Sequence, residues 1–207
     1  NKQKQKAKEA AEEYVKNIIK TYSKRDAASS SSLDITDPFI KDFVWSFKHQ
    51  DTEGQRACWH EILKDFKSTT PMNRLVCGDV GFGKTEIALR ASFHSVLNNQ
   101  QVVVLAPTTI LANQLYHSFF GRLTSFGVRV DVLSSLSLKK EKTVLDFMCK
   151  KIDILIGTSS LLFRVAVLRQ CGLFIVDEEH RFGVKEKELV LSLNPSVNFL
   201  SLSATPI

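Results

Sequence analysis

The sequence lacks the long apolar runs of a membrane protein. No stretch of its 207 residues approaches the ~20 apolar residues that a helix needs to cross a bilayer, and no signal-peptide pattern opens the chain. It also lacks the composition of a disordered protein, because 43% of its residues are hydrophobic and 24% are charged, close to globular averages. These features argue against membrane-spanning and secreted proteins. They predict one globular domain, alone or with an appendage.

Cysteine is scarce and scattered. Cys58, Cys77, Cys149 and Cys171 form no CxxC pair, and no histidine stands at zinc-ligand spacing from them. Isolated thiols suit a reducing compartment, where a buried cysteine behaves as a small hydrophobe. We therefore expect a cytoplasmic protein without a cysteine-bound metal cluster.

A basic charge spread over the whole chain is also missing. The net charge is +6, but residues 1–26 hold eight basic and four acidic side chains, so the remaining 181 residues carry only +2. A basic surface can bind nucleic acid. This distribution permits such a partner without requiring one.

The N-terminal segment predicts one helix over residues 5–24. Apolar or small side chains recur there at three- and four-residue steps, at Ala7, Ala10, Ala11, Tyr14, Val15, Ile18, Ile19 and Tyr22. Two interpretations stay open: a solvated helix docked through a narrow apolar face, or a basic arm that touches nucleic acid or transmits motion. Residues 27–32, rich in alanine and serine, predict a flexible joint. We therefore divide the chain into an arm with its linker at 1–34 and a domain at 35–207.

The sequence pattern of the domain predicts an α/β fold. Asp37 caps an expected helix with Pro38 at its first position, and the expected buried side chains are Phe39, Ile40, Phe43, Val44 and Phe47. Further helices are expected near 53–67, 84–98, 109–124 and 138–150. Strands are expected at 73–77, 102–106, 128–133, 152–156, 173–176 and 197–203. Several strands are apolar throughout, which predicts a mostly parallel sheet covered by helices on both faces.

A phosphate-binding motif lies between the first strand and its helix. The pattern GxxxxGK(S/T) is matched by Gly78, Asp79, Val80, Gly81, Phe82, Gly83, Lys84 and Thr85. Glycines let successive backbone N–H groups face one anion, and the following helix adds its positive end. Lys84 would reach the β- and γ-phosphates of a nucleotide, and the Thr85 hydroxyl would complete a Mg²⁺ shell. We therefore expect ATP and Mg²⁺ as ligands.

An acidic motif follows the strand at 173–176. Asp177, Glu178, Glu179 and His180 stand at its carboxyl end, where ligands bind in open α/β sheets. Asp177 would hold Mg²⁺, and Glu178 would orient and deprotonate the water that attacks the γ-phosphate. Lys84, Asp177 and Glu178 are therefore the expected catalytic residues.

Taken in order, these motifs resemble those of superfamily-two helicases and translocases. The match comprises the phosphate motif (motif I), Pro107-Thr108-Thr109 (motif Ia), Gly157-Thr158 (motif Ib), Asp177-Glu178-Glu179-His180 (motif II) and Ser203-Ala204-Thr205 (motif III). The longer strings around motifs I and II resemble the bacterial transcription-repair coupling factor family. The branch-migration helicase RecG is the near relative, but its usual pattern has serine at Phe82 and glutamine at Glu179. The basic arm also resembles the helix that precedes the coupling factor's motor.

The resemblance implies a RecA-like ATP-binding lobe and a set of partners. Family members walk along double-stranded DNA, displace a stalled RNA polymerase and recruit excision-repair proteins. The resemblance also implies a set of residues that touch the DNA backbone independently of sequence, or that couple this contact to the nucleotide. The set comprises Pro107, Thr108, Thr109, Gly157, Thr158, His180, Ser203 and Thr205. A RecG-type branch-migration helicase remains the alternative.

Gln55 has two interpretations that the sequence leaves open. The resemblance implies that its amide reads adenine. Thr52 and Gln55 also fit a capping box, in which Gln55 reaches back to the backbone N–H of Thr52.

The ends of the sequence indicate a fragment. It begins at Asn1 and ends at Ile207, directly after motif III. By resemblance, a superfamily-two motor needs a second lobe whose arginines complete the ATP site, and such arginines are worth ~10³ to ~10⁵ in rate. We therefore expect the isolated chain to be a monomer that binds nucleotide weakly and hydrolyses it negligibly.

Two other classes fit less well. A GTPase-like switch would need Asn-Lys-x-Asp after a strand, whereas Asn1-Lys2 lacks the aspartate and lies in the arm. A scaffold that only binds DNA or polymerase would have no need of Lys84, Thr85, Asp177 and Glu178 together.

Overall fold

The six strands form one parallel sheet in the order β1-β6-β5-β2-β4-β3. The computed structural model describes residues 2–79, 81–134, 137 and 139–204. The strands are β1 (Asn73–Cys77), β2 (Val102–Leu105), β3 (Val130–Leu133), β4 (Ile154–Gly157), β5 (Leu173–Asp177) and β6 (Asn198–Ser203). Each lies within two residues of its expected position. The α/β class with a parallel sheet is therefore confirmed.

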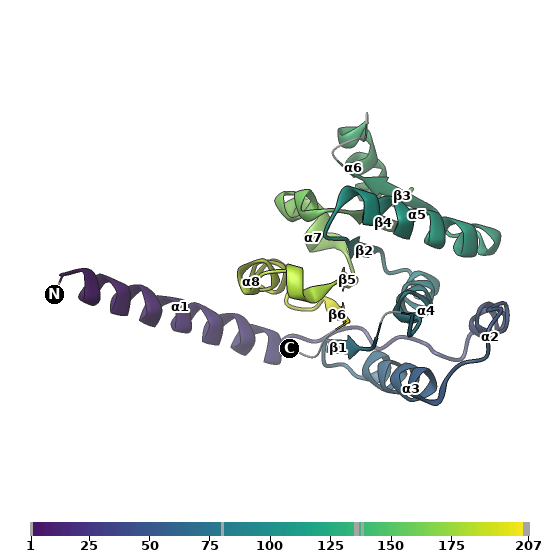
Figure 1. Ribbon diagram of the computed structural model, residues 1–207, viewed down its shortest axis with the longest axis horizontal. Coiled ribbons are helices and arrows are strands. Elements are labelled where there is room, and N and C mark those ends of the chain that lie inside the picture. Colours follow the sequence, from purple (N-terminus) through teal and green to yellow (C-terminus); the bar gives the residue numbers. More distant parts are fainter. Residues whose placement is uncertain (1, 80, 135–136, 138, 205–207) are drawn as a thin grey trace.

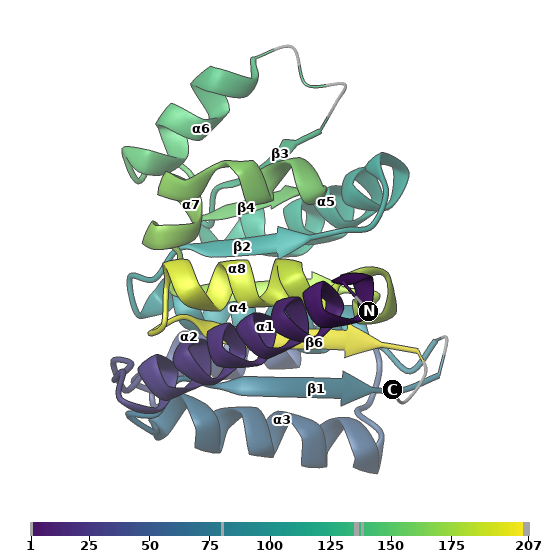
Figure 2. The ribbon, with the colours of Figure 1, turned by 90° about the vertical axis from the view of Figure 1, so that its left-hand side faces the viewer.

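Helices cover both faces of this sheet (Figures 1 and 2). The helices are α1 (Lys2–Asp26), α2 (Pro38–Trp45), α3 (Glu53–Lys67), α4 (Lys84–Leu97), α5 (Thr109–Leu123), α6 (Lys140–Met148), α7 (Val165–Gln170) and α8 (Val184–Leu193). Two of these helices, α7 and α8, were not predicted from the sequence. Among the described helices, none combines the length and apolar character that crossing a bilayer requires.

Alternation along the strands divides the core in two. In β2, Val102 and Val104 join the cluster that packs against α2 to α5, while Val103 joins the one under α6 to α8. Successive side chains of a strand point to opposite faces. An apolar strand with helices on both sides therefore buries every residue, as all four residues of β2 do.

The alanine- and serine-rich segment is not the flexible joint that its composition predicts. Ser30 N donates to Thr69 O at 2.7 Å, and Leu33 N donates to Phe66 O at 2.8 Å. The Ser32 hydroxyl donates to Lys67 O at 2.9 Å. Contacts with residues distant in the sequence therefore fasten this segment to the end of α3 and the loop after it.

Arg25 anchors the end of α1 to the domain. Its buried guanidinium donates to the main-chain oxygens of Pro195 at 3.1 Å, Pro71 at 3.4 Å and Met72 at 2.5 Å. These carbonyls lie in the loops that enter β6 and β1. Burial lowers the pKa of Arg25, and nearby Tyr22 and Asp26 act in the opposite direction.

The rest of α1 extends away from the sheet on the side that α8 covers (Figure 1). Val15 and Ile19 belong to its expected docking stripe but are 51% and 60% exposed. The side chains of Ala7, Ala10 and Ala11 lie outside the described residues. The docked-helix interpretation therefore holds for the C-terminal end of α1 and is wrong for Val15 and Ile19.

The short helix α2 begins as expected and buries less than expected. The Asp37 carboxylate accepts from Phe39 N at 2.9 Å, and Pro38 occupies the first position. Ile40 and Phe43 are buried, but Phe39 is 61% exposed. The expectation for Phe39 was wrong because α2 packs on α4 along the side that bears Ile40 and Phe43.

His94 of α4 makes the stability of the fold depend on pH. Its ring is fully buried, stacks on Phe66 at 5.3 Å between centroids, and meets Trp59 edge-on. Within the described residues, neither ring nitrogen has a hydrogen-bond partner. Burial lowers the pKa of His94 from 6.5 to about 4, and the charge of Asp34 acts against this effect.

A pKa lower in the folded state means that acid stabilises the unfolded chain. We expect full stability above the unfolded pKa of 6.5 and a progressive loss as the pH falls towards about 4, reaching about 3 kcal/mol. Urea unfolding measured across this window tests the effect. His94→Phe should flatten the dependence, and an equally steep decline in that variant would contradict the assignment.

Candidate nucleotide and nucleic-acid site

The five motifs lie side by side along one edge of the sheet. This edge is formed by the carboxyl ends of the parallel strands, which present in spatial order motif I after β1, motif III at the end of β6, motif II after β5, motif Ia after β2 and motif Ib after β4. Strand registers fix the neighbours: Cys77 faces Ser203, and Leu105 faces both Val176 and Gly157. Motif II therefore separates the phosphate motif from the motifs expected to touch DNA.

The phosphate motif forms an open turn at the start of α4. Gly81 and Gly83 have φ angles of 87° and 82°, a backbone region that favours glycine. The Lys84 ammonium donates to Gly78 O at 2.6 Å and to Asp79 O at 3.0 Å, so the loop's own carbonyls hold it over the turn. Val80 lies outside the described residues.

Motif III is bonded directly to the phosphate motif. Gly78 N donates to Ser203 O at 3.1 Å. Because β6 lies between β1 and β5, Ser203 stands between the phosphate loop and motif II. Thr205 lies outside the described residues.

The two acids of motif II have different surroundings. Burial raises the pKa of Asp177, the neighbouring Glu178 charge raises it further, and Lys84 lowers it. Glu178 is 29% exposed and adopts a left-handed backbone conformation with φ 59° and ψ 60°. Such a conformation is uncommon outside glycine and costs about 1 to 3 kcal/mol, which is typical of functional sites.

The remaining residues of motif II brace the turn. His180 Nδ1 lies 3.3 Å from Glu178 Oε2. Glu179 is buried, and its Oε1 accepts from the Lys187 ammonium of α8 at 3.1 Å. Lys187 could not be predicted from a motif, because its contact with Glu179 depends on how α8 packs.

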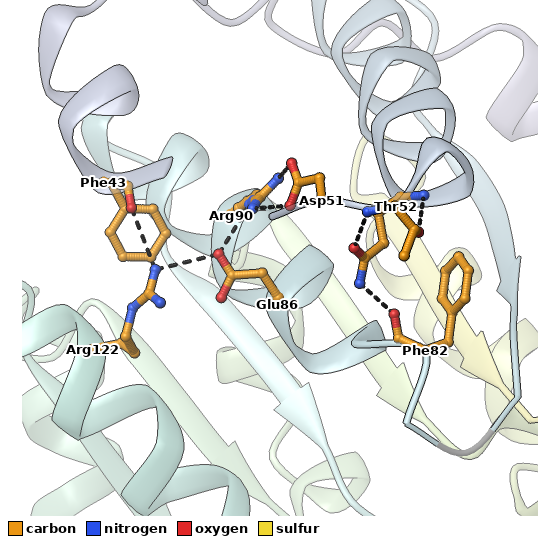
Figure 3. Close-up of polar contacts among 8 residues, drawn as sticks. Phe43, Asp51, Thr52, Phe82, Glu86, Arg90 and Arg122 are labelled. Atoms are coloured by element: carbon orange, nitrogen blue, oxygen red, sulfur yellow. Dashed lines mark hydrogen bonds and ion pairs between the residues drawn. The ribbon is translucent and has the colours of Figure 1, made fainter. Parts of the chain in front are cut away.

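Gln55 forms the capping box and also contacts the phosphate loop; its partners Thr52 and Phe82 are labelled in Figure 3. Its Oε1 accepts from Thr52 N at 2.9 Å, and the Thr52 hydroxyl accepts from Gln55 N at 3.2 Å. Its Nε2 donates to Phe82 O. The capping interpretation is confirmed, and the structure adds a bond to the loop that the sequence did not predict.

Motifs Ia and Ib end their strands in hydroxyl-bearing turns. The Thr108 hydroxyl caps α5 by accepting from Leu111 N at 3.2 Å. The Thr158 and Ser160 hydroxyls lie 3.2 Å apart. A cavity of about 140 Å³ lies beside these turns, and its lining includes Pro107, Ser159, Asp177, Glu178 and Arg181. The acids of motif II and the turns of motifs Ia and Ib therefore border one hollow.

The donor set fits a nucleotide with Mg²⁺. Asp177 is a largely buried carboxylate with a raised pKa, and a cation beside it would offset the cost of its charge. The Thr85 hydroxyl, in the first turn of α4, would offer a second oxygen ligand of the type that Mg²⁺ prefers. Lys84 and the backbone amides at the start of α4 are groups that could contact the phosphates.

Comparison with known proteins agrees with this geometry. A family profile described as DEAD/DEAH box helicase matches residues 52–207. The chain belongs to the DEAD/DEAH box helicase family. The expected RecA-like lobe is thereby confirmed, with α1 as an N-terminal helical arm.

Similar members of this family carry one name. The chain is 42% identical over its whole length to the transcription-repair-coupling factor of Borreliella burgdorferi, and 41% identical over 98% of its length to that of Escherichia coli. It spans only 18% of the length of either relative. The resemblance inferred from the motifs is therefore confirmed.

Solved structures of helicases share the fold. RecG bound to a three-way DNA junction matches 91% of this chain and 25% of its own, with a TM-score of 0.77 and 32% identity. The UvsW helicase of bacteriophage T4 matches 85% of this chain and 62% of its own, with a TM-score of 0.63 and 15% identity. The UvsW match shows the fold alone.

Proposed function

We propose that this chain is the ATP-binding motor lobe of a double-stranded-DNA translocase that displaces stalled RNA polymerase and couples transcription to nucleotide excision repair. The observation that carries the proposal is the order of the motifs along the sheet edge, with the acids of motif II between the phosphate loop and the proposed DNA contacts. The name shared by the relatives supports the polymerase and repair roles.

The residues divide the work of ATP hydrolysis. Lys84 and the amides of the phosphate loop would bind the β- and γ-phosphates, and Thr85 with Asp177 would hold Mg²⁺. Bound Mg²⁺ supplies positive charge to the phosphate oxygens. Glu178 would orient the attacking water and take its proton. Ser203 O accepts a hydrogen bond from the phosphate loop, so motif III would transmit a movement of that loop to β6.

The DNA-facing residues would bind phosphates of either strand. We assign this role to Thr108, Thr109, Gly157 and Thr158. Pro107, which has no N–H to donate, would shape the turn that carries Thr108, and His180 would be the coupling residue beside Glu178. Hydroxyls and amides that bond phosphates give grip without reading sequence. The Thr108 hydroxyl already accepts from Leu111 N, so its O–H group remains to donate to a phosphate oxygen.

Gln55 would read the adenine base with the amide donor and acceptor that its bonds to Thr52 and Phe82 leave free. An amide offers two N–H groups and two lone pairs on its oxygen. One N–H is used by Phe82 O and one lone pair by Thr52 N, which together fix which end of the amide is oxygen. The fixed amide suits adenine, which presents an amino donor beside an acceptor, and opposes guanine, which presents two acceptors.

Activity of the intact protein tests the proposal. We expect ATP hydrolysis that linear duplex DNA stimulates without regard to sequence, together with release of RNA polymerase stalled on a template. ATP hydrolysis that duplex DNA leaves unchanged would contradict the motor function.

A RecG-type helicase is the second candidate, supported by the RecG match. Stimulation of hydrolysis by branched DNA alone, with RNA polymerase left in place, would favour it. We also propose that the 207-residue chain alone hydrolyses ATP negligibly, because the resemblance implies that arginines of a second lobe complete the ATP site.

A further inference from the structure

The segment that carries Gln55 has a second attachment, made by the residue just before the cap. Asp51 precedes Thr52, and its carboxylate accepts two hydrogen bonds from Arg90: Nη1 to Oδ2 at 2.7 Å and Nη2 to Oδ1 at 2.8 Å (Figure 3). The Arg90 side chain is only 1% exposed. Two parallel bonds between planar groups fix orientation as well as distance.

Arg90 belongs to the same helix as the phosphate-binding lysine. It lies in α4, which begins at Lys84, and its Nε donates to Glu86 Oε1 at 3.0 Å. The same Glu86 oxygen accepts from Arg122 Nη2 of α5 at 3.3 Å. Two carboxylates and two guanidiniums therefore form one cluster in which Glu86 and Arg90 are buried, Asp51 and Arg122 are partly exposed, and all three donor nitrogens of Arg90 are in use.

Two aromatic rings pack against the guanidiniums of this cluster. The Arg122 guanidinium lies 4.8 Å from the centre of the Phe43 ring, and Arg90 lies 5.6 Å from that of Phe47. Arg122 also donates to Phe43 O at 3.3 Å. The chain from α2 to the cap is thus packed onto α4 and α5 before it reaches Thr52.

The two attachments hold opposite ends of the turn at 52–55. Asp51 ties its beginning to Arg90 in α4, and Gln55 ties its end to Phe82 in the phosphate loop. Both attachments connect the turn to the phosphate loop and α4, which together would hold the phosphates. A nucleotide spans from this unit to its base, so the position of the Gln55 amide relative to Lys84 decides which base edge meets it. Without the Asp51 bonds, the turn would keep its contact with the phosphate loop. It would lose the contact with Arg90 that fixes its orientation relative to α4.

We propose that Arg90, acting through Asp51, is a positioning residue for base discrimination: it holds the Gln55 amide where adenine is accepted and guanine is rejected. The inference rests on the proposed nucleotide function and on Gln55 as the base reader. Phosphate binding would then depend on Lys84 and the phosphate loop. Base preference would depend in addition on the bonds between Asp51 and Arg90.

The test compares three ligands in the intact protein. Dissociation constants for ATP, GTP and inorganic tripolyphosphate, each with Mg²⁺, are measured by calorimetry for the unaltered protein and for Asp51→Ala. We expect the preference for ATP over GTP to fall about tenfold, while the tripolyphosphate constant changes by less than about twofold. Asp51→Glu should restore part of the preference. Asp153→Ala removes the partner of another paired arginine, Arg129, at the far end of the sheet and should change none of these values.

The outcomes separate this inference from the proposed function. An unchanged ATP preference in Asp51→Ala overturns the inference, as does an equal loss for all three ligands, which indicates a merely structural role. If the unaltered protein binds tripolyphosphate but does not prefer ATP, the inference is wrong and the phosphate site stands. If it binds none of the three, the proposed function fails as well. Should Asp51→Ala not fold, the isosteric Asp51→Asn is measured against the same criteria.

Discussion

Replacing Glu178 with glutamine should abolish ATP turnover while preserving ATP binding. The amide keeps the size of the side chain but cannot accept a proton from the attacking water, and general-base catalysis contributes about 10²- to 10⁴-fold. The left-handed backbone at this residue comes from the turn and not from the carboxylate, so the side chain should keep its place. We therefore expect kcat in the intact protein to fall by about that factor and ATP affinity to change little.

A matched variant separates the base from a general effect of charge. Glu186 of α8 lines the same cavity as Glu178, away from the strand end. Glu186→Gln removes the same charge and should leave kcat within about twofold. Steady-state hydrolysis and equilibrium ATP binding are measured for both variants. Turnover that survives in Glu178→Gln would show that another group is the base.

Replacing Lys84 with alanine should remove both tight nucleotide binding and hydrolysis. The Lys84 ammonium rests on Gly78 O and Asp79 O, so it is already poised over the loop where phosphates would lie. Its loss takes a positive charge away from the phosphates and from Asp177. One preorganised donor of this kind is worth about 10²- to 10³-fold in rate.

The fold should tolerate the loss of Lys84, because both of its hydrogen bonds go to carbonyls of an exposed loop. Unchanged thermal unfolding would show this. Lys185→Ala, which removes an exposed lysine of α8, serves as the control and should retain activity. ATP binding by Lys84→Ala at the affinity of the unaltered protein would show that phosphates bind elsewhere.

Local signals predicted the sheet and the motifs. Short apolar or partly apolar runs bounded by turns predicted every strand within two residues. The reason is plainest for β2, β4 and β5, which are buried on both faces and need apolar residues at nearly every position. The glycine pattern between Cys77 and Lys84 predicted the phosphate loop for an equally local reason. The capping box at Thr52 and Gln55 could likewise be read from a spacing of three.

Contacts between distant residues could not be predicted in this way. Asp51 and Arg90 are 39 positions apart, and their pairing depends on how α4 packs beneath the segment before α3. The spacing of Glu86 and Arg90 does indicate a helical ion pair, but not its burial. The segment at 27–32 looked flexible because its partners, such as Thr69, lie far along the chain.

The nature of Arg25's acceptors sets how the arm responds to its surroundings. All three are backbone carbonyls, which carry no charge to be titrated and lie in a buried site that mobile ions screen poorly. Contacts between lysines and nucleic-acid phosphates, by contrast, weaken steeply as ionic strength rises. Concentrated salt should therefore weaken the proposed contacts with DNA well before it loosens the C-terminal end of α1.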